Sequence, residues 1–289
     1  MSSANSVPLK APGAELYIPD GKPVAEALKR TTHMGLCAHQ DDLEIMAYHG
    51  VLECFGRKDR GFTGVVMTNG GGSARDAQYK DYTDEQMMEV RRLEQKKAAL
   101  IGEYAAQFLL HHPSSAVKTG HPDVLSDLET VFAACRPKVV YTHNFADKHD
   151  THVAVVSRVI EALRKLPKDQ RPEKVIGCEV WRDLDWLCDK DKVVMPVDAH
   201  ENLADSLMGV FDSQIVGGKR YDLAARGRRL ANATFFESHA VDKNKALIWG
   251  MDLTPLVADP SKDPFDHVKS YMDRFADEVK DRIHRMKKK

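Results

Sequence analysis

Two short stretches of the sequence place histidine and aspartate at spacings that suit a metal ion. In the run HMGLCAHQDDLEIMAYHG, residues 33–50, His39 and Asp42 lie three apart, and a tight turn or first helical turn would bring them to one side. An imidazole nitrogen and a carboxylate oxygen form a zinc-type ligand pair. Asp41 would point elsewhere and could serve as a base. On these residues alone, a turn histidine beside an acidic helix N-cap explains the pattern equally well.

A second stretch offers the missing third ligand. His149 and His152 lie three apart in HNFADKHDTHVAVVSRVIEAL, residues 143–163, at the head of a predicted helix that follows the apolar run VVYT. One of them could bind the metal while the other faces a substrate. Both stretches are therefore predicted to form a strand, a polar turn and a helix, and open α/β sheets build their ligand sites at such strand ends. Packing alone does not readily explain this repetition.

The two stretches resemble the signatures of a known enzyme family. AHQDDLE, residues 38–44, is similar to the AHPDDxE signature of the PIG-L/LmbE-type N-acetylglucosamine deacetylases, and DKHDTH, residues 147–152, is similar to their second signature, D-x-H-P-D-H. The helix carrying Arg91 and Glu94 resembles the family's R-x-x-E helix, and residues 211–214 resemble its H-x-S-Q segment. The likeness covers roughly residues 32–214. The paired metal motifs are specific, and the other two are weak when taken alone.

The resemblance implies a metal centre with acid–base groups beside it. Asp41 would be the general base, and His149 would be the electrostatic or general-acid histidine next to the scissile amide. Arg91 would contact the substrate. The ligands of Zn²⁺, or of another divalent metal, would be His39, Asp42 and His152.

The sequence departs from the family pattern at several positions. Gln40 stands where the family has a proline, so the turn is less fixed in φ. Thr151 stands where the family has an aspartate that supports the catalytic histidine, and Asp150 or Asp147 could take its place. Asp212 replaces the histidine of the H-x-S-Q segment. Met46, Tyr48 and His49 stand where the family often has glycine, which suggests a narrower or differently shaped pocket. The substrate of better-known relatives is therefore not assigned to this sequence.

The run WRDLDW, residues 181–186, supplies further candidates for substrate contact. Trp181 and Arg182 combine an aromatic face with a charged group, and acids follow directly. Such a set suits stacking on a sugar and recognition of its hydroxyl groups. It equally suits a core tryptophan beside surface charges.

The elements between these motifs predict an α/β fold. Apolar, β-branched runs alternate with amphipathic segments, which favours a Rossmann-like, mostly parallel sheet with helices on both faces. Thr83–Gln86 is a capping box that begins a helix reaching Ile101. Arg91 and Glu94 on that helix could also be a surface ion pair. We expect strands at 34–38, 62–68, 105–110, 139–142, 175–181 and 193–197, and other helices at 43–52, 123–135, 202–214, 221–234 and 266–286.

Four other segments carry weaker expectations. The glycine run at 69–73 could cradle a phosphate but lacks the lysine of a P-loop, so a loop that lets the backbone approach the substrate is the simpler interpretation. His111 and His112 have no acids nearby in the sequence and suit a loop or a pocket rim. Residues 235–242 could form a late strand that brings Glu237 or His239 near the site. A solvated or subunit-facing surface is expected for Arg226, Arg228 and Arg229.

Bulk properties limit the function classes. The chain has 289 residues, and 42 basic against 43 acidic residues give a net charge of −1, which speaks against bulk nucleic-acid binding. Five cysteines without a C-x-x-C pattern suggest reduced, mostly buried thiols and a cytoplasmic location. No run approaches the ~20 apolar residues of a membrane span. We expect an N-terminal arm over residues 1–30, a single domain with a C-terminal helical extension over 31–289, and a homo-oligomer.

The sequence thus predicts a zinc-dependent N-deacetylase that hydrolyses the N-acetyl group of an amino sugar or an N-acetylglucosamine-containing glycan or conjugate. Two alternatives stay open. The same centre could hydrolyse another small N-acyl amide, or the chain could be a nucleotide-binding Rossmann module with structural histidines.

Overall fold

The sheet follows the predicted alternation of strands and helices. The computed structural model describes residues 7–287 and contains an 8-stranded sheet with the order β1-β4-β3-β2-β5-β6-β8-β7. Neighbours from β4 to β6 are parallel, whereas β1, β8 and β7 join antiparallel at the two edges. The predicted mostly parallel α/β fold is confirmed. The strands are β1 (Glu15–Tyr17), β2 (Thr31–Cys37), β3 (Gly61–Thr68), β4 (Ala106–His112), β5 (Val139–His143), β6 (Lys174–Cys178), β7 (Val193–Pro196) and β8 (Leu247–Asp252).

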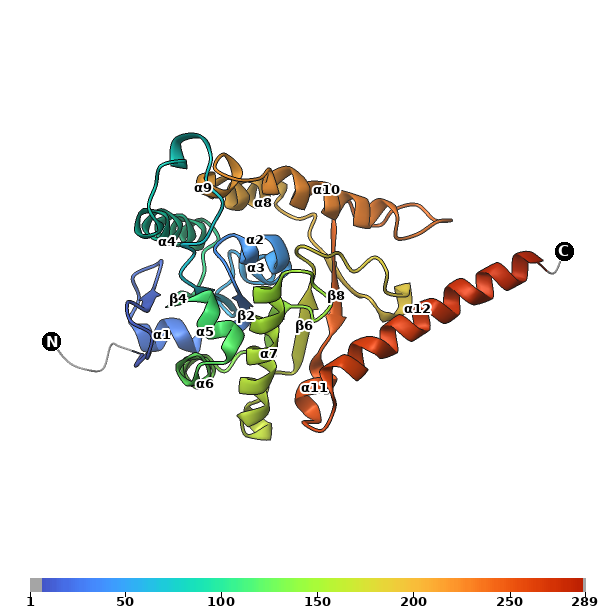
Figure 1. The fold of residues 1–289 in the computed structure, drawn as a ribbon, viewed down its shortest axis with the longest axis horizontal. Helices are drawn as coiled ribbons and strands as arrows, with labels where there is room; N and C mark the ends of the chain where they lie inside the picture. The colour runs from blue at the N-terminus through green and yellow to red at the C-terminus, as the bar shows by residue number, and fades with distance from the viewer. Residues whose placement is uncertain (1–6, 288–289) are drawn as a thin grey trace.

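Helices cover both faces of this sheet, as Figure 1 shows. One core cluster includes apolar residues of α1 (Val24–Lys29), α5 (Ser114–Thr119), α6 (Pro122–Cys135), α7 (Asp150–Lys165) and α11 (Thr254–Ala258). The other cluster draws on α2 (Asp42–Met46), α3 (Tyr48–Cys54), α4 (Asp84–Ile101) and α8 (Glu201–Gly209). The remaining helices are α9 (Asp212–Ile215), α10 (Tyr221–Thr234) and α12 (Pro264–Lys287).

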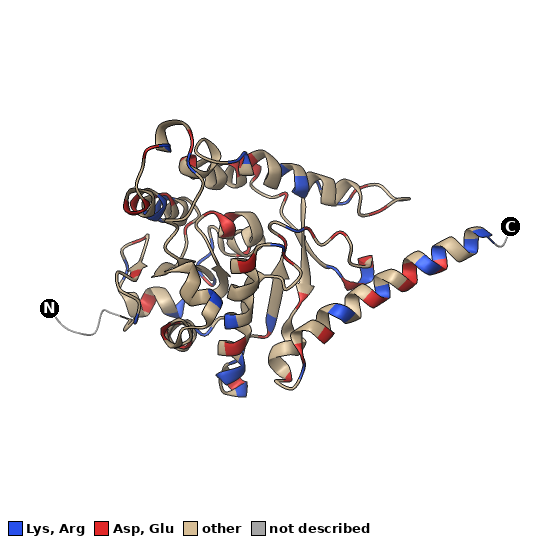
Figure 2. Cartoon of the chain, in the orientation of Figure 1, with Lys and Arg blue, Asp and Glu red and all other residues tan. Residues whose placement is uncertain are grey.

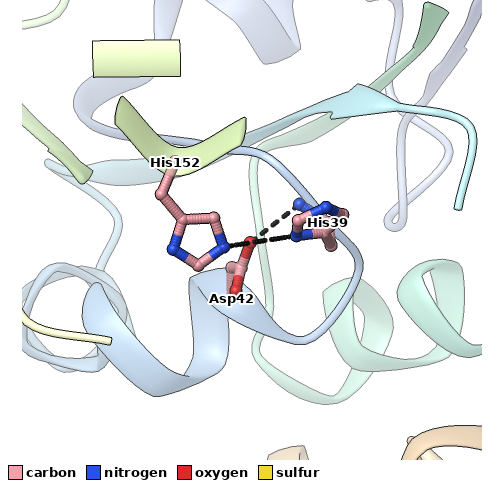
Figure 3. Close-up of side chains that lie close together, drawn as sticks. All are labelled: His39, Asp42 and His152. Carbon is pink, nitrogen blue, oxygen red and sulfur yellow. Dashed lines mark hydrogen bonds and ion pairs between the residues drawn. The ribbon is translucent and has the colours of Figure 1, made fainter. Parts of the chain in front are cut away.

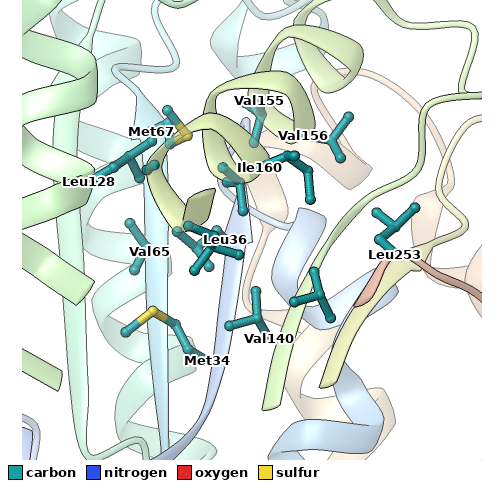
Figure 4. Packing of buried hydrophobic residues seen from close by; sticks show 14 of the residues in the cluster. Met34, Leu36, Val65, Met67, Leu128, Val140, Val155, Val156, Ile160 and Leu253 are labelled. Atoms are coloured by element: carbon teal, nitrogen blue, oxygen red, sulfur yellow. The ribbon is translucent and has the colours of Figure 1, made fainter. Parts of the chain in front are cut away.

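Successive side chains of the central strands point to opposite faces of the sheet and belong to different core clusters. Met34 and Leu36 of β2 lie in the same cluster as Val156 and Ile160 of α7, and Figure 4 shows these side chains together. Cys37, the next residue of β2, belongs to the cluster on the opposite face. Burial of large apolar side chains contributes about 1.5–3 kcal/mol each, so these side chains hold the central strands between the two helical layers.

The order of the strands determines where a ligand site can form. From β2 the chain moves outward through β3 and β4, and it then returns to the other side of β2 with β5 and continues to β6. The direction of winding therefore changes between β2 and β5, which pair in parallel from His33↔Val139 to Gly35↔Tyr141. The crevice at the carboxyl ends of two such strands is the usual ligand site of an open α/β sheet. Both histidine–aspartate stretches lie at this crevice.

Two predicted helices are divided in the structure. The helix expected at 43–52 is α2 followed by α3, because the backbone leaves helical geometry at Ala47 (φ −108°, ψ 15°). The helix expected at 202–214 is α8 followed by α9, with a break at Val210 and Phe211. The capping box of α4 is confirmed, with Thr83 accepting a hydrogen bond from the backbone N–H of Gln86.

The strand expected at 235–242 is wrong. These residues form turns and bends, and Phe235 and Val241 are 81% and 90% exposed, so neither Glu237 nor His239 is brought to the sheet. The strand of this region is instead β8, a continuous apolar run that fills the position between β6 and β7. The strand expected to reach Trp181 ends earlier, at Cys178.

The two ends of the described chain differ in how they meet the domain. Near the N-terminus, β1 pairs with β4, and the backbone N–H groups of Lys10 and Ala11 donate to the Asp127 carboxylate at 2.6 and 3.2 Å. At the other end, α12 projects from the body with alternating charges along it (Figures 1 and 2). The first six residues of the expected arm and the final Lys288 and Lys289 lie outside the described range. None of the described helices is long and apolar enough to cross a membrane.

Candidate metal centre

The turn after β2 brings His39 and Asp42 together. Asp42 begins α2, and its Oδ2 atom accepts a hydrogen bond from the backbone N–H of His39 at 2.8 Å and lies 3.2 Å from His39 Nδ1. Between them, Asp41 has φ 92°, a left-handed conformation that is uncommon outside glycine and that aspartate tolerates better than most residues. Thr68 at the end of β3 donates to the Ala38 carbonyl through its hydroxyl at 2.8 Å and its backbone N–H at 3.0 Å. The turn is therefore held from the adjacent strand.

The loop between β5 and α7 positions the second pair of histidines. The Asn144 side chain donates to the Cys178 carbonyl and accepts from the Ala146 N–H, both at 2.8 Å. Asp147 then accepts from the backbone N–H of His149 at 3.2 Å, and its other oxygen lies 3.1 Å from Nδ1 of the fully buried His152. A carboxylate on the second nitrogen of a ligand histidine fixes the ring and its tautomer. Asp147 thus supports the ring of His152, whereas the family resemblance offers it as a support for His149.

Three side chains from these two segments form a nearly equilateral triangle of donor atoms (Figure 3). His39 Nδ1 and Asp42 Oδ2 are 3.2 Å apart, Asp42 Oδ2 and His152 Nε2 are 3.4 Å apart, and the two nitrogens are 3.3 Å apart. A tetrahedral zinc ion with bonds of about 2.0–2.1 Å keeps its ligand atoms roughly 3.3–3.4 Å apart. The triangle therefore fits one face of such a site and leaves a further coordination position for a water molecule or a substrate oxygen.

His143, which is not among the predicted site residues, lies directly behind this triangle. Its ring stacks on that of His152 at 3.8 Å, and His143, Asp147 and His152 also lie close enough to hold a cation. However, His143 Nε2 accepts the backbone N–H of Ala38 at 3.0 Å, which occupies the lone pair that a metal would need. The first triangle is therefore the better metal site. A histidine directly at the end of β5 was the available sequence signal.

We call the residues at the bottom of the site its floor: His39, Asp41, Asp42, Arg91, His149 and His152. The pKa values of the floor residues follow from buried charges that lie in contact. Burial opposes the ionised form of Asp42, but His152 and His39 hold the pKa of this carboxyl well below its usual range. Burial likewise opposes the charge on His152, yet the Asp42 and Asp147 carboxylates raise its pKa to about 9. A proton on His152 would compete with a metal, because a ligand imidazole must be neutral. Burial and the adjacent Asp42 raise the pKa of Asp41 well above the usual value.

Asp41 and His149 flank the triangle and line the same cavity. The His149 ring lies edge-on to His39 at 5.1 Å and is stacked on His152 at 4.5 Å. Burial, followed by the charge of His152, lowers the pKa of His149 to about 4. Two polar groups next to one candidate metal position can take up or donate protons at a bound molecule.

Arg91 holds two turns of the floor together. This arginine is 3% exposed, and its guanidinium donates to the carbonyls of Gln40 and Gly70 at 2.9 and 3.1 Å. Gly70 has φ +77°, and a Cβ atom there would collide with the Gln40 side chain and lie 3.2 Å from Cδ of Arg91. The glycine run thus permits a close approach between the Asn69–Ser73 loop and the ligand turn. Arg91 and Glu94 are both buried, so the alternative of a surface ion pair between them is wrong.

Glu94 instead connects α4 to α9. Its two carboxylate oxygens accept the Ser213 N–H at 2.8 Å and the Ser213 hydroxyl at 2.6 Å. The R-x-x-E helix and the S-Q segment, which the sequence had marked separately, are therefore in direct contact. Asp212, in place of the family histidine, accepts from the Tyr79 hydroxyl at 2.7 Å.

The arginine-rich face of α10 is not simply a solvated surface. Arg229 is buried and donates to the carbonyls of Glu44 and Ile45 at 2.6 and 3.2 Å, which caps the last turn of α2. Arg228 lines the cavity, and only Arg226 is an exposed residue in an ordinary surface pair, with Asp205 at 3.1 Å. The sequence signal was the spacing of four residues between Arg229 and the buried Ala225, which places both on the inner face.

The cavity has a volume of about 610 Å³, within the range of small-molecule sites. Of the predicted substrate contacts, Arg91 and Trp181 line it, whereas Arg182 is not among the lining residues. His112 is the last residue of β4, is buried and lies 3.0 Å from Asp127, so the expectation that it belongs to a loop or a pocket rim is wrong. The cavity is also lined by Gln214 of the S-Q segment and by Arg228. Four further lining residues were not predicted: Lys118, Lys219, Arg220 and Tyr221.

The fold and the site define an α/β protein with a candidate metal centre at the switch point of its sheet. Within this class, residues 34–163 match the family model of the GlcNAc-PI de-N-acetylases, PIG-L. The segment contains both histidine–aspartate stretches, and the resemblance to PIG-L/LmbE-type deacetylases that the motifs predicted is confirmed there. No functionally curated protein has significant sequence similarity to the chain.

Several solved structures share the fold. The N,N'-diacetylchitobiose deacetylase from Pyrococcus horikoshii has a TM-score of 0.63 at 12% identity, covering 79% of this chain and 86% of that chain. The conserved protein TT1542 from Thermus thermophilus has a TM-score of 0.59 at 16% identity, covering 81% and 99%. GalB, the 4-carboxy-2-hydroxymuconate hydratase from Pseudomonas putida, has a TM-score of 0.57 at 12% identity, covering 77% and 96%. At such low identities the comparison establishes the fold alone.

Proposed function

We propose that the protein is a zinc-dependent amidohydrolase that removes the N-acetyl group of an amino sugar, or of an N-acetylglucosamine-containing glycan or conjugate, and releases acetate. The triangle of His39, Asp42 and His152, with Asp41 beside it in a ligand-sized cavity, carries this proposal. The PIG-L match over residues 34–163 supports it, as does the occurrence of deacetylases among proteins of the same fold.

The side chains suit amide hydrolysis in the following way. Asp41 would take a proton from the attacking water as its oxygen bonds to the acetyl carbon. His149 would donate a hydrogen bond to the oxygen that becomes negative. The amine nitrogen would receive a proton from Asp41 or His149 as its bond to carbon breaks, which leaves acetate and a free amine. A zinc ion held by His39, Asp42 and His152 would polarise the carbonyl and lower the pKa of the water to about 7.

Two alternative functions would use parts of the same site. Another small N-acyl amide could be hydrolysed by the same groups, because they act only on the acyl carbon and the amide nitrogen. The hydratase GalB has the same fold, so the fold alone does not select the reaction. A nucleotide-binding module would use the Asn69–Ser73 loop, which lines the cavity, to hold phosphate.

The purified protein can be tested for both metal and activity. We expect about one zinc per chain by mass spectrometry, and release of acetate from acetylated chitobiose or N-acetylglucosamine. Faster hydrolysis of N-acyl amino acids would favour the other amidohydrolase. Absence of metal together with retained nucleotide would favour the binding module and contradict the proposal. The expected homo-oligomer, the cytoplasmic location and the boundary at residue 30 stay predictions.

A further inference from the structure

The outer part of the cavity has an excess of positive charge. Among residues 7–287, its charged lining residues are five cations and two carboxylates, and both carboxylates, Asp41 and Asp42, belong to the floor. The chain as a whole has 42 basic and 43 acidic residues, so its composition does not explain the excess. Apart from Arg91 in the floor, the cations form what we name the cationic mouth: Lys118, Lys219, Arg220 and Arg228.

Three cations of the mouth have no acidic partner among residues 7–287. Arg220 is paired with Asp222 at 2.8 Å, whereas Lys118, Lys219 and Arg228 form no ion pair with a carboxylate of the described chain. They differ in this from Arg226, which lies on the same helix as Arg228 but outside the cavity and is paired with Asp205. Cations without acidic partners around a cavity lower the free energy of an anion that enters it.

Contacts within the mouth hold two of these cations in place. The Arg228 guanidinium donates to the carbonyl of Val180, which leaves its other N–H groups for a ligand. The Lys219 ammonium lies 4.7 Å from the centre of the Trp181 ring, and Lys148 approaches the same ring at 5.9 Å. Trp181 in turn stacks on His149 with ring centres 6.0 Å apart. The indole therefore connects the mouth to the floor and positions cations.

We propose that the cationic mouth binds an anionic group, a phosphate or a carboxylate, on the part of the substrate that lies away from its N-acetyl group. The planar guanidinium of Arg228 suits two oxygens of one such group, and the lysines add charge. The anion site itself follows from the lining of the cavity. Its assignment to the substrate of a deacetylase rests on the proposed function.

Matched substrates test the proposal. Acetate release is measured at fixed ionic strength from three compounds: the methyl glycoside of N-acetylglucosamine, N-acetylglucosamine 1-phosphate, and a glycoside of glycolic acid that carries a carboxylate. We expect kcat/KM for one of the anionic compounds to exceed that of the neutral glycoside by about tenfold or more, and the compound that gains shows which anion is bound. In Arg228→Gln and Lys219→Gln this ratio falls by a similar factor. Arg226→Gln, the matched control, keeps it.

A binding measurement separates this proposal from the deacetylase assignment. Inorganic phosphate and succinate are titrated into the zinc-loaded wild type, the Lys219→Gln/Arg228→Gln double variant and Arg226→Gln. If no compound is hydrolysed but one anion binds at least about tenfold more weakly to the double variant, the anion site stands and the deacetylase assignment fails. Equal kcat/KM for neutral and anionic glycosides overturns the proposal. So does anion binding that is absent or is unchanged in the double variant, since an unchanged affinity would place the anion at the metal.

Discussion

The floor and the mouth of the cavity are built in opposite ways. Apart from Arg91 of α4, the floor consists of short side chains at the ends of β2 and β5. Asp42 and His152 within it are buried and lie in contact with each other, and His152 also contacts Asp147. The mouth consists of long cations from α5, α10 and the segment before α10, and most of these are exposed. The strands themselves position the floor, whereas helices and loops outside the sheet supply the mouth.

The difference between floor and mouth corresponds to the extent of the match to the PIG-L family model. The PIG-L match ends at residue 163 and includes every residue of the proposed metal centre. Lys219, Arg220 and Arg228 lie beyond it. The proposed chemistry therefore rests on the part of the chain that matches the family model, whereas the proposed anion site rests mostly on residues outside that part. The predictions below test that division, in order of decreasing effect.

Removal of a ligand from the floor should have the largest effect. His152→Ala should lose both bound zinc and measurable activity, because two donor atoms cannot hold the ion in place of three. Zinc should raise the melting temperature of the wild type but not that of the variant. Metal content and thermal unfolding check this, with the exposed His239→Ala as a control that should behave like wild type. Full zinc occupancy in His152→Ala would remove this residue from the ligand set.

Removal of the base should leave the metal in place. Asp41→Asn keeps the size of the side chain but cannot take a proton, so we expect kcat to fall by about 10²–10⁴-fold with zinc content unchanged. Steady-state kinetics and metal analysis on the same sample check both parts. Asp183→Asn, at an exposed position outside the cavity, is the matched control. A variant as fast as wild type would show that Asp41 is not the base.

Removal of the Asp147 carboxylate, which lies behind the floor, should have a smaller effect than removal of a metal ligand. Asp147→Asn leaves the three donor atoms intact but weakens the orientation of His152, so we expect zinc affinity to fall by about 10–100-fold. A competition titration with a chelator measures it. Asp150 is the other aspartate that could have supported the histidine, and Asp150→Asn should leave the zinc affinity close to that of wild type. If Asp150→Asn is the weaker binder, the assignment of the supporting carboxylate is reversed.

The Asn69–Ser73 loop, which lines the cavity, should tolerate little change at Gly70. Gly70→Ala would adopt φ +77° with a side chain and collide with Gln40, so we expect the free energy of unfolding to fall by about 1 kcal/mol or more. Gly72→Ala, in the same loop with open space around its Cβ position, should be near neutral. Urea denaturation compares the two. Equal stability of both variants would contradict the close approach at Gly70.

His33, which belongs to neither the floor nor the mouth, should make the free energy of unfolding depend on pH. Burial lowers the pKa of His33, on β2, to about 4. The unfolded state, with a pKa near about 6.5, then binds more protons than the folded state between these values, so stability is lost as the pH falls from 6.5 towards 4. In His33→Asn, the free energy of unfolding should fall less between pH 7 and pH 5 than in wild type, both at saturating zinc. An identical fall in the two proteins would show that this histidine does not contribute.

The sequence predicted the floor better than the mouth for a physical reason. His39, Asp42 and His152 follow apolar strands, and the ends of parallel strands converge at a known edge, so local patterns were sufficient. Arg228 reaches the cavity through the packing of α10 against β8, α8 and α9, and Lys219 lies in the segment that leads into this helix, which no local period reveals. His143 was missed because its neighbour across the sheet, the Ala38 N–H, is 105 residues away in sequence. The strand expected at 235–242 failed because those residues find no sheet neighbour within the described chain.

The most direct test of the metal centre is zinc-edge anomalous diffraction from crystals of the protein loaded with one equivalent of zinc. We predict a single strong peak between His39 Nδ1, Asp42 Oδ2 and His152 Nε2, at about 2.0–2.2 Å from each atom. A peak at another group of residues, or no peak at these three, would contradict the account.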